Sequence, residues 1–313
     1  MRVAVITTSY PGAEADPAGH FVQAEARQLI RLGHEVVVFA PDARATGDGI
    51  DVIGGFSLGA FGWPGAAARL RARPYRIAGV ARWASHTRAA LVHAGPFDRI
   101  VAHWSVPSAW PIATGDASRA ELEVVSHGGD VRLLVAMPAP VRAHVAAAIA
   151  RRAARWRFVS ESLRDALTAG LPARLRDDVE AIACVTPSHL EMPDVRARSR
   201  ALRLAARRPI VCCVGRLVAS KRVDRIIAHV ARSHAEKQLV VIGDGPERGR
   251  IERLARRSSV DARFLGLLPR DEALAWIGAS EALLFASEAE GCSTVLREAE
   301  ALGIRVEVVP VLE

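Results

Sequence analysis

"PIVCCVGRLVASKRVDRIIAHVARSHAEKQLVVIGDGP", residues 209–246, contains a complete strand–helix–strand unit. The apolar runs at 209–214 and 238–242 have the length of buried strands, and glycine follows each. The segment between them, 221–233, places apolar residues at helical spacing. Because parallel strands need a crossover connection, this stretch predicts a parallel sheet covered by helices.

The same alternation of strands and helices continues in both directions from this unit. We expect further strands at 2–6, 35–39, 49–53, 99–102, 123–126, 157–159, 181–185, 262–264, 282–285 and 305–309. Residues 186–209 contain Thr-Pro-Ser-His and an Arg/Ala-rich run. This composition is typical of a linker that leads into the second domain. The pattern predicts an α/β protein with two doubly wound Rossmann-like domains, 1–185 and 186–313, that face a central cleft.

Composition limits the class of protein. A chain of 313 residues with 50% hydrophobic residues is long enough for two packed cores. Its apolar runs are shorter than the 18 or more residues of a spanning helix, and the first run, 2–6, is too short for a signal peptide. The four cysteines, Cys184, Cys212, Cys213 and Cys292, lack CxxC spacing, which indicates reduced thiols in a cytoplasmic protein. We expect no metal and no other cofactor, because no His/Cys/Asp cluster has ligand spacing.

The net charge of +8 calls for an acidic partner. Nucleic acid, an anionic membrane surface and a phosphorylated substrate are the candidates. We do not expect nucleic-acid binding, because no helix-turn-helix, zinc finger or aromatic-and-basic strand pattern accompanies the arginines. A phosphorylated substrate and peripheral contact with the inner face of an anionic membrane both stay open.

Residues that directly follow strands should carry the function, because ligands of doubly wound folds bind at the carboxyl ends of the strands. Gly215, Arg216 and Lys221 follow the strand at 209–214, and two cations beside a glycine suit a diphosphate. A second glycine turn, Gly-Asp-Gly-Pro with Gly245, follows the strand at 238–242.

Two further turns of the predicted second domain contain candidate ligand-binding residues. Leu267 and Leu268 follow the strand at 262–264 and could hold a flat base against backbone amides. In "EAEGCSTVLREAEALG", residues 288–303, Glu290 and Glu298 flank a small polar turn that opens a helix. They are either two solvated acids or a pair of carboxylates directed at one ligand over the helix N-terminus.

This order of motifs, GR(L)…K, GDGP, FLG and E-x7-E, resembles the retaining glycosyltransferases of the GT-B fold, specifically glycosyltransferase family 4. In the first half, "SYP…GHFVQAEARQLIRLGHEVVVFAP" resembles the family's glycine loop and first helix, and "AHWSVP" and "SHGGDV" resemble its acceptor side. The resemblance spans nearly the whole chain and is strongest over 210–303. Compared with the family, the chain is short at the C-terminus: it ends at Glu313, before the usual Gly-Gly-x-Pro-Glu turn and the helix that crosses back.

The resemblance implies a role for each matching residue. Arg216 and Lys221 would bind the donor diphosphate and neutralise the leaving group without a metal. Glu298 would bind the donor ribose and Glu290 the transferred sugar. The remaining donor-binding residues would be Gly19, Gly215, Gly245, Leu267, Leu268, Gly291, Cys292, Ser293, Thr294 and Val295.

On the other side of the cleft, the resemblance implies that His127 faces the sugar as a catalytic residue. Asp130 would cap the following helix and orient the His127 loop. His103 and Trp104 would line the acceptor cleft, and a role in the core is the alternative for both.

The leading interpretation is therefore an enzyme that moves a sugar from a nucleotide-diphosphate sugar to a hydroxyl acceptor, with retention of anomeric configuration, in glycan or glycoconjugate biosynthesis. The acceptor could be a glycan, a lipid-linked molecule or a small metabolite, and uridine and guanosine donors are both open.

Two other classes of protein are alternatives to this interpretation. A nicotinamide-dependent oxidoreductase of sugar nucleotides would need a glycine fingerprint after the first strand and a Tyr-x-x-x-Lys pair, which Tyr10 and Tyr75 do not form. A degenerate, non-catalytic protein that binds sugar nucleotides or nucleic acid is the remaining alternative, suggested by the short C-terminus and the basic charge.

Overall fold

The structure is a computed structural model that describes residues 1–12, 16, 18–41, 50–55, 57–62, 65–115, 119–287 and 293–310. The chain divides into two compact units, the second of which takes over at Leu190. The boundary expected from the sequence lies after residue 185. The cleft expected between the domains stays a prediction.

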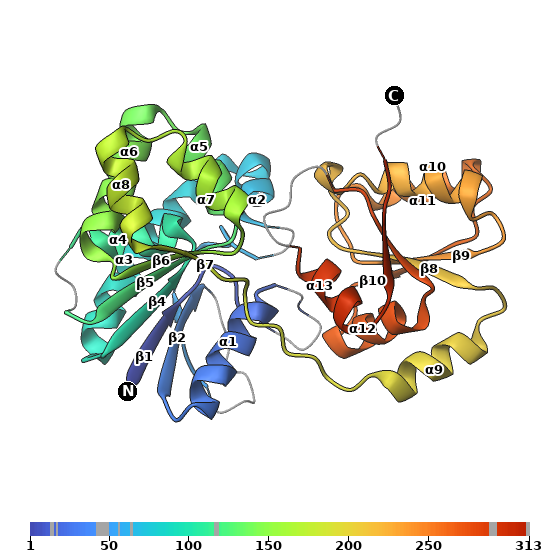
Figure 1. The fold of residues 1–313 in the computed structure, drawn as a ribbon, viewed down its shortest axis with the longest axis horizontal. Coiled ribbons are helices and arrows are strands. Elements are labelled where there is room, and N and C mark those ends of the chain that lie inside the picture. Colours follow the sequence, from blue (N-terminus) through green and yellow to red (C-terminus); the bar gives the residue numbers. More distant parts are fainter. Residues whose placement is uncertain are drawn as a thin grey trace. The chain divides into compact units, whose positions relative to one another are not determined.

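The first unit is built on a sheet of seven parallel strands in the order β3-β2-β1-β4-β5-β6-β7, with helices on its faces (Figure 1). The strands are β1 (Arg2–Ile6), β2 (Glu35–Pro41), β3 (Asp51–Gly55), β4 (Arg99–His103), β5 (Glu121–Ser126), β6 (Arg155–Phe158) and β7 (Ala183–Val185). The helices are α1 (His20–Arg31), α2 (Ala66–Ala72), α3 (Ile77–Ala94), α4 (Trp110–Ala113), α5 (Gly129–Ala136), α6 (Ala139–Arg152), α7 (Glu161–Thr168) and α8 (Ala173–Ile182), with short turns η1 (Pro74–Arg76) and η2 (Ser105–Ala109).

The second unit has five parallel strands in the order β10-β9-β8-β11-β12. They are β8 (Ile210–Val214), β9 (Gln238–Ile242), β10 (Ala262–Gly266), β11 (Ala282–Phe285) and β12 (Arg305–Val308). The helices are α9 (Arg196–Ala205), α10 (Val223–Ser233), α11 (Arg248–Arg257), α12 (Arg270–Ala279) and α13 (Thr294–Ala301), with the short turn η3 (Ala219–Lys221). Helices α10 and α11 lie on one face of this sheet, and α12 and α13 lie on the other (Figure 1).

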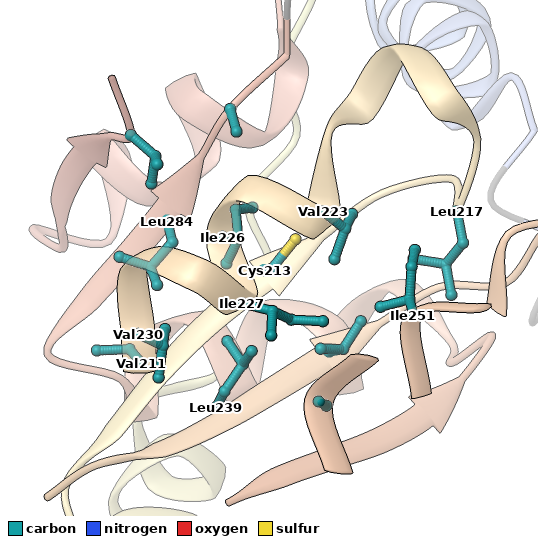
Figure 2. Close-up of a cluster of buried hydrophobic side chains, with 14 of the residues drawn as sticks. Val211, Cys213, Leu217, Val223, Ile226, Ile227, Val230, Leu239, Ile251 and Leu284 are labelled. Carbon is teal, nitrogen blue, oxygen red and sulfur yellow. The ribbon is translucent and has the colours of Figure 1, made fainter. Parts of the chain in front are cut away.

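Alternate residues of the central strand β8 enter two different cores. Val211 and Cys213 pack with the apolar residues of α10 and α11 (Figure 2), whereas Ile210 and Cys212 pack with α12. A strand buried on both faces reads as a continuous apolar run, which is why "PIVCCV" predicts it. Burial raises the pKa of both thiols to about 12, so they are protonated core residues.

Helix α9 corrects the prediction that residues 186–209 are a linker. The Arg/Ala-rich run folds because it packs on α12: Arg203 donates hydrogen bonds from Nη2 to the Gly278 oxygen (2.5 Å) and from Nε to the Ala279 oxygen (3.2 Å). Gly278 permits this approach, because a Cβ there would lie 2.5 Å from Ser199 Oγ. Val195, Leu202 and Ala206 enter the core formed with α12, but most of the run is arginine and alanine, so it does not stand out as an apolar segment.

Among the described residues, no helix is both long enough and apolar enough to cross a membrane.

Candidate active site

Both sheets reverse their strand order at one point, and such a switch point is where doubly wound folds bind ligands. In the first unit the point lies between β1 and β4, and in the second it lies between β8 and β11. His103 ends β4, and Gly215 directly follows β8. The residues expected from the sequence therefore stand beside the two switch points.

His127 follows β5 and sits on a buried imidazole. Its Nε2 lies 2.9 Å from Nδ1 of His103, and the two rings stack with centroids 5.1 Å apart at 13°. The rings of Phe21 and Trp104 pack on His127 with centroids at 4.7 and 4.8 Å. Ser188 Oγ lies 3.4 Å from the other ring nitrogen, Nδ1. Both ring nitrogens of His127 thus have protein partners.

Asp130 holds the loop that carries His127. Its Oδ1 accepts hydrogen bonds from the backbone amides of His127 and Gly128, both at 3.1 Å. Its Oδ2 accepts from the backbone amide and the hydroxyl of Ser105, both at 2.8 Å. The carboxylate is 2% exposed and lies in the first turn of α5, where a negative charge is favourable. Asp130 therefore ties the turn after β4 to the turn after β5, in keeping with the orienting role expected for it.

The two imidazoles are neutral near pH 7. Burial, and then the positive charge of Arg157, hold the pKa of His103 well below its usual value of 6.5. Burial also lowers the pKa of His127, helped by His103 and Arg157, and Asp130 opposes the shift without reversing it. Neutral rings can accept a hydrogen bond as well as donate one.

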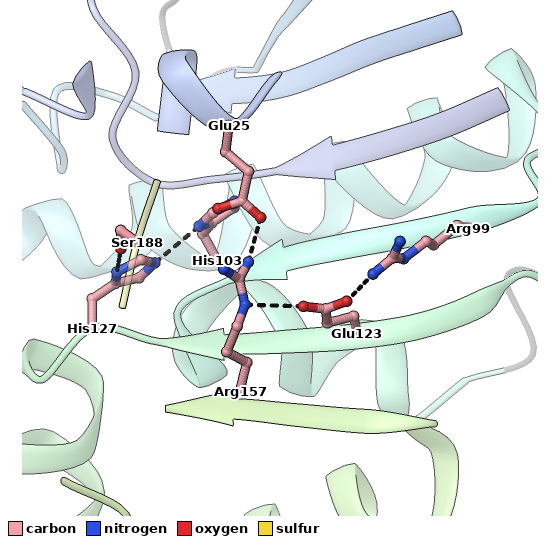
Figure 3. A network of polar contacts seen from close by, with 7 residues as sticks. All are labelled: Glu25, Arg99, His103, Glu123, His127, Arg157 and Ser188. Atoms are coloured by element: carbon pink, nitrogen blue, oxygen red, sulfur yellow. Dashed lines mark hydrogen bonds and ion pairs between the residues drawn. The ribbon is translucent and has the colours of Figure 1, made fainter. Parts of the chain in front are cut away.

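A chain of buried charges lies beneath this pair (Figure 3). Arg157 of β6 forms ion pairs with Glu25 of α1 and with Glu123 of β5, the latter at 3.0 Å from Nε to Oε1. Glu123 also pairs with Arg99. Two cations and two carboxylates balance within the chain, which is the condition for burying them.

Three predicted residues of this side have specific places. His103 is 0% exposed beneath His127, so it is no lining residue of a cleft, which corrects one of the two roles expected for it. The reason is that β4 is a central strand whose end the rings of His127 and Trp104 cover. Trp104 is half-buried with a positive φ of 69°. Gly19 begins α1, and a Cβ there would lie 2.0 Å from the Ser9 oxygen.

In the second unit, glycines let three turns interlock. A Cβ on Gly243 would lie 2.0 Å from the Gly215 oxygen, and one on Gly245 would lie 2.4 Å from the Leu217 oxygen. Backbone hydrogen bonds join the same turns, from Leu217 N to Asp244 O (2.8 Å) and from Gly243 N to Gly266 O (2.8 Å). The glycines of "GDGP" thus have a packing role, which is independent of any donor contact.

Two cations follow β8 in the sequence next to these turns. Arg216 is exposed, and Lys221 is half-buried at the end of η3, with Cε 3.9 Å from a Cβ built on Gly215. Ser287 Oγ donates to the Ser220 oxygen at 3.4 Å, which brings the turn after β11 next to Lys221. Ser287 immediately precedes residues 288–292, so Glu290, Gly291 and Cys292 lie outside the described residues.

Glu298 on α13 is 7% exposed and has a partner that the sequence analysis missed. Its Oε1 accepts hydrogen bonds from Arg270 Nη2 at 2.9 Å and Nε at 3.2 Å. Arg270 follows Pro269 at the first position of α12, directly after the turn that contains Leu267 and Leu268. A cation just after a strand end was the signal that could have pointed to it.

The remaining predicted donor-side residues lie at the start of α13 and in the turn before α12. Ser293 is the residue before α13, and Thr294 opens that helix. Val295 and Leu268 pack against the core formed with α12, whereas Leu267 is 38% exposed.

Comparison with protein families assigns both units. Residues 18–177 match the glycosyl transferase 4-like domain, and residues 194–309 match the glycosyl transferases group 1. The chain belongs to the family 4-like glycosyltransferases. The resemblance that the motifs indicated is confirmed. A comparison with curated protein sequences found no match.

Solved structures similar to this glycosyltransferase confirm its GT-B fold. Sucrose-phosphate synthase from Thermosynechococcus elongatus has a TM-score of 0.69 at 20% identity, over 98% of this chain and 80% of that one. HepE from Anabaena, in complex with UDP and glucose, has a TM-score of 0.68 at 17% identity, over 98% and 80% of the two chains. The catalytic domain of starch synthase IV from Arabidopsis thaliana, bound to ADP and acarbose, has a TM-score of 0.67 at 17% identity, over 98% and 82%.

Proposed function

We propose that this glycosyltransferase moves a sugar from a nucleotide-diphosphate sugar to a hydroxyl acceptor with retention of anomeric configuration. Two strand-end clusters, each within its own unit, carry the proposal: a fixed, neutral imidazole in the first unit, and a glycine platform with two cations in the second. Structurally similar proteins bind UDP, UDP-glucose or ADP, which supports a nucleotide-diphosphate donor.

Arg216 and Lys221 hold the diphosphate in this proposal. Their charges neutralise the leaving group as the bond to the sugar breaks, so the reaction needs no metal ion. Backbone amides at the start of α13 add to the same field, because a helix N-terminus favours an anion. Glu298, which Arg270 orients, binds the ribose.

His127 contacts the transferred sugar from the first unit. Its bond to His103 is short and buried, whereas the 3.4 Å contact to Ser188 is long. A sugar hydroxyl therefore reaches His127 most readily by replacing Ser188 at Nδ1. Glu290 binds hydroxyls of the same sugar, and the acceptor is a glycan, a lipid-linked molecule or a small metabolite.

Donor turnover tests the proposal. Release of the nucleoside diphosphate is followed with UDP-, GDP- and ADP-sugars and a panel of hydroxyl acceptors, and NMR of the anomeric proton reports the configuration of the product. We expect retention, activity that survives a chelator, and loss of activity in the Arg216→Ala/Lys221→Ala variant. Lys237→Ala is the matched control, because Lys237 pairs with Glu281 at the opposite end of the sheet.

Binding is measured on the same samples to separate the alternatives. A donor at 100 times its dissociation constant stabilises the protein by about 2.7 kcal/mol, which a thermal shift detects. Donor binding without hydrolysis or transfer would establish the non-catalytic alternative. An inverted product would overturn retention, and activity lost with chelator and restored by manganese would overturn the metal-free diphosphate site.

The proposal includes peripheral contact with an anionic membrane surface. Helix α9 exposes Arg200 and, just beyond its end, Arg207, and Leu204 between them is 77% exposed. Co-sedimentation with anionic vesicles that declines with salt would support it. Equal binding to neutral vesicles, or unchanged binding of the Arg200→Ala/Arg207→Ala variant, would contradict it.

A further inference from the structure

Three side chains of metal-ligating chemistry meet in the second unit, away from the strand ends described above. His229 lies on α10, His234 follows the end of that helix, and Glu307 lies on the edge strand β12. One ligand atom from each lies within 4.8 Å of the others. Because Glu307 is 73 residues from His234, sequence spacing could not reveal the cluster. The expectation of no metal rested on sequence spacing, which does not reach this cluster, and it stays untested.

The geometry of the cluster is convergent. Nε2 of His229 lies 2.5 Å from Oε1 of Glu307, and Nε2 of His234 lies 3.1 Å from the same oxygen. The rings meet edge to face, with centroids 5.2 Å apart at 67°, so both nitrogens point to one place. Arg305 donates to the other carboxylate oxygen at 3.0 Å and fixes its orientation, as an outer-shell partner does for a metal ligand.

The side chains are largely withdrawn from solvent, with exposures of 13% for His229, 9% for His234 and 20% for Glu307. Hydrogen bonds to Glu307 would satisfy one nitrogen of each ring. However, Nδ1 of His234 is buried and has no hydrogen-bond partner among the described residues. When Nε2 donates to Glu307 it carries the proton and Nδ1 has the lone pair, so an ion at Nε2 requires the other tautomer, with the proton on Nδ1; no partner of Nδ1 among the described residues opposes that tautomer.

Two imidazoles and one carboxylate are a donor set that Zn²⁺ uses in three-ligand sites. Ligands about 2.0–2.2 Å from a tetrahedral ion lie roughly 3.4 Å from each other. The two nitrogens lie 2.5 and 3.1 Å from the Glu307 oxygen here, so an ion would replace these hydrogen bonds and move the ligand atoms slightly apart. We propose that His229, His234 and Glu307 bind a divalent transition-metal ion of the zinc class, with water in the fourth position.

The ion has a structural role in this proposal. It connects the C-terminal end of α10 to β12, which is an edge strand held by β11 alone in its sheet. Lys221 precedes the start of α10 and His234 follows its end, and a helix of 11 residues is about 16 Å long. The site is thus separate from the proposed diphosphate site, and glycosyl transfer does not pass through it.

Metal binding to the untagged full chain tests the proposal. After removal of metal with a chelator, Zn²⁺ is titrated by equilibrium dialysis and Co²⁺ by visible absorption, where a tetrahedral site gives intense bands. We expect one ion per chain and affinity that falls as the pH falls, because protons compete for the imidazoles. Zn²⁺ should also raise the melting temperature.

Two variants give the decisive comparison. Glu307→Gln and His229→Gln should each weaken Zn²⁺ binding by more than the roughly 10- to 100-fold loss that outer-shell substitutions cause. His93→Ala, which removes an exposed histidine of α3, should bind as the wild type does. Far-UV circular dichroism shows whether each variant is folded, and metal binding is compared for the variants that retain the fold. Absence of a stoichiometric ion, or a Co²⁺ spectrum that neither substitution changes, would overturn the proposal.

Discussion

The strand-end clusters of the two units are held in place by different means. In the first unit, one buried carboxylate, Asp130, collects four hydrogen bonds and fixes the loop of His127. In the second, glycines allow backbone to pack directly on backbone, as between Gly243 and Gly215. One device orients a particular side chain, whereas the other builds a backbone platform next to Lys221 and the exposed Arg216.

This difference fits the chemistry proposed for each side. A neutral imidazole must present one nitrogen in one direction, which needs a fixed ring and a fixed tautomer. Cations that neutralise a diphosphate act mainly through charge and tolerate more freedom. Substitutions that remove either the Asp130 carboxylate or the glycine packing test this comparison.

Replacement of Asp130 by alanine should have the largest effect. It leaves buried donors of Ser105, His127 and Gly128 without their acceptor. Hydrogen bonds to a charged group contribute about 1.5–3 kcal/mol each and do not add fully, so we expect a loss of roughly 3–5 kcal/mol. Urea unfolding followed by tryptophan fluorescence measures it, since five of the six tryptophans precede residue 190. Ser105→Ala, which removes a single hydroxyl donor, should cost much less, and equal losses would contradict the role of Asp130.

Replacement of Gly243 by alanine should break the platform of the second unit. Its φ of +127° and the 2.0 Å approach of a Cβ to the Gly215 oxygen both disfavour a side chain. The strained φ alone costs on the order of 1–3 kcal/mol, so we expect at least about 2 kcal/mol in total. The fluorescence of Trp276 reports on this unit, and donor binding should weaken with it.

Gly249→Ala is the control for this substitution. Gly249 lies inside α11, where the nearest atom to a Cβ would be Arg253 Nη1 at 3.5 Å. Alanine in a helix is about 0.5–1 kcal/mol better than glycine, so this variant should be neutral or more stable. Similar destabilisation by both substitutions would show that the interlocked turns are not what matters.

The positions of the strands and of their carboxyl ends could be predicted well from the sequence. Apolar runs such as 209–214 and the glycines after them located the strands and their carboxyl ends, because both follow from local composition. The α/β class and the GT-B fold followed from this alternation and from the order of motifs.

Contacts between residues distant in the chain could not be predicted from local composition. The pairs Arg157–Glu25 and Arg270–Glu298 join residues 132 and 28 positions apart, and neither partner has a local pattern that names the other. Helix α9 was missed for a related reason, since it depends on contacts with α12. The role of Glu290 stays a prediction.

Glu298 and Glu290 should divide the donor between them. Loss of charge-assisted bonds of about 1.5–3 kcal/mol in Glu298→Gln should weaken donor binding roughly 10- to 100-fold, because the ribose is held equally in ground and transition states. Glu290→Gln should chiefly lower the turnover rate, because the sugar ring gains positive charge as the leaving group departs.

Binding of the nucleotide diphosphate alone separates the two acids. It should bind the Glu290 variant almost normally and the Glu298 variant poorly. Glu300→Gln, an exposed acid on the same helix, serves as the control for charge. Equal weakening by the Glu290 and Glu298 substitutions would mean that the acids do not divide the donor in this way.

The smallest expected effect concerns pH and returns to the imidazole pair of the first unit. The pKa values of His103 and His127 lie well below 6.5 in the folded protein, so the unfolded chain binds more protons as the pH falls. Stability present above about pH 6.5 is therefore lost as the pH falls below it. His103→Gln should reduce the loss of stability that urea unfolding measures between about pH 7 and pH 5.5. The exposed His93 provides the matched substitution, His93→Gln, which should leave the pH dependence as it is. If the His103 and His93 variants both lose stability with falling pH as the wild type does, the fold does not hold His103 and His127 neutral. The comparison between the two units is then wrong for the first unit.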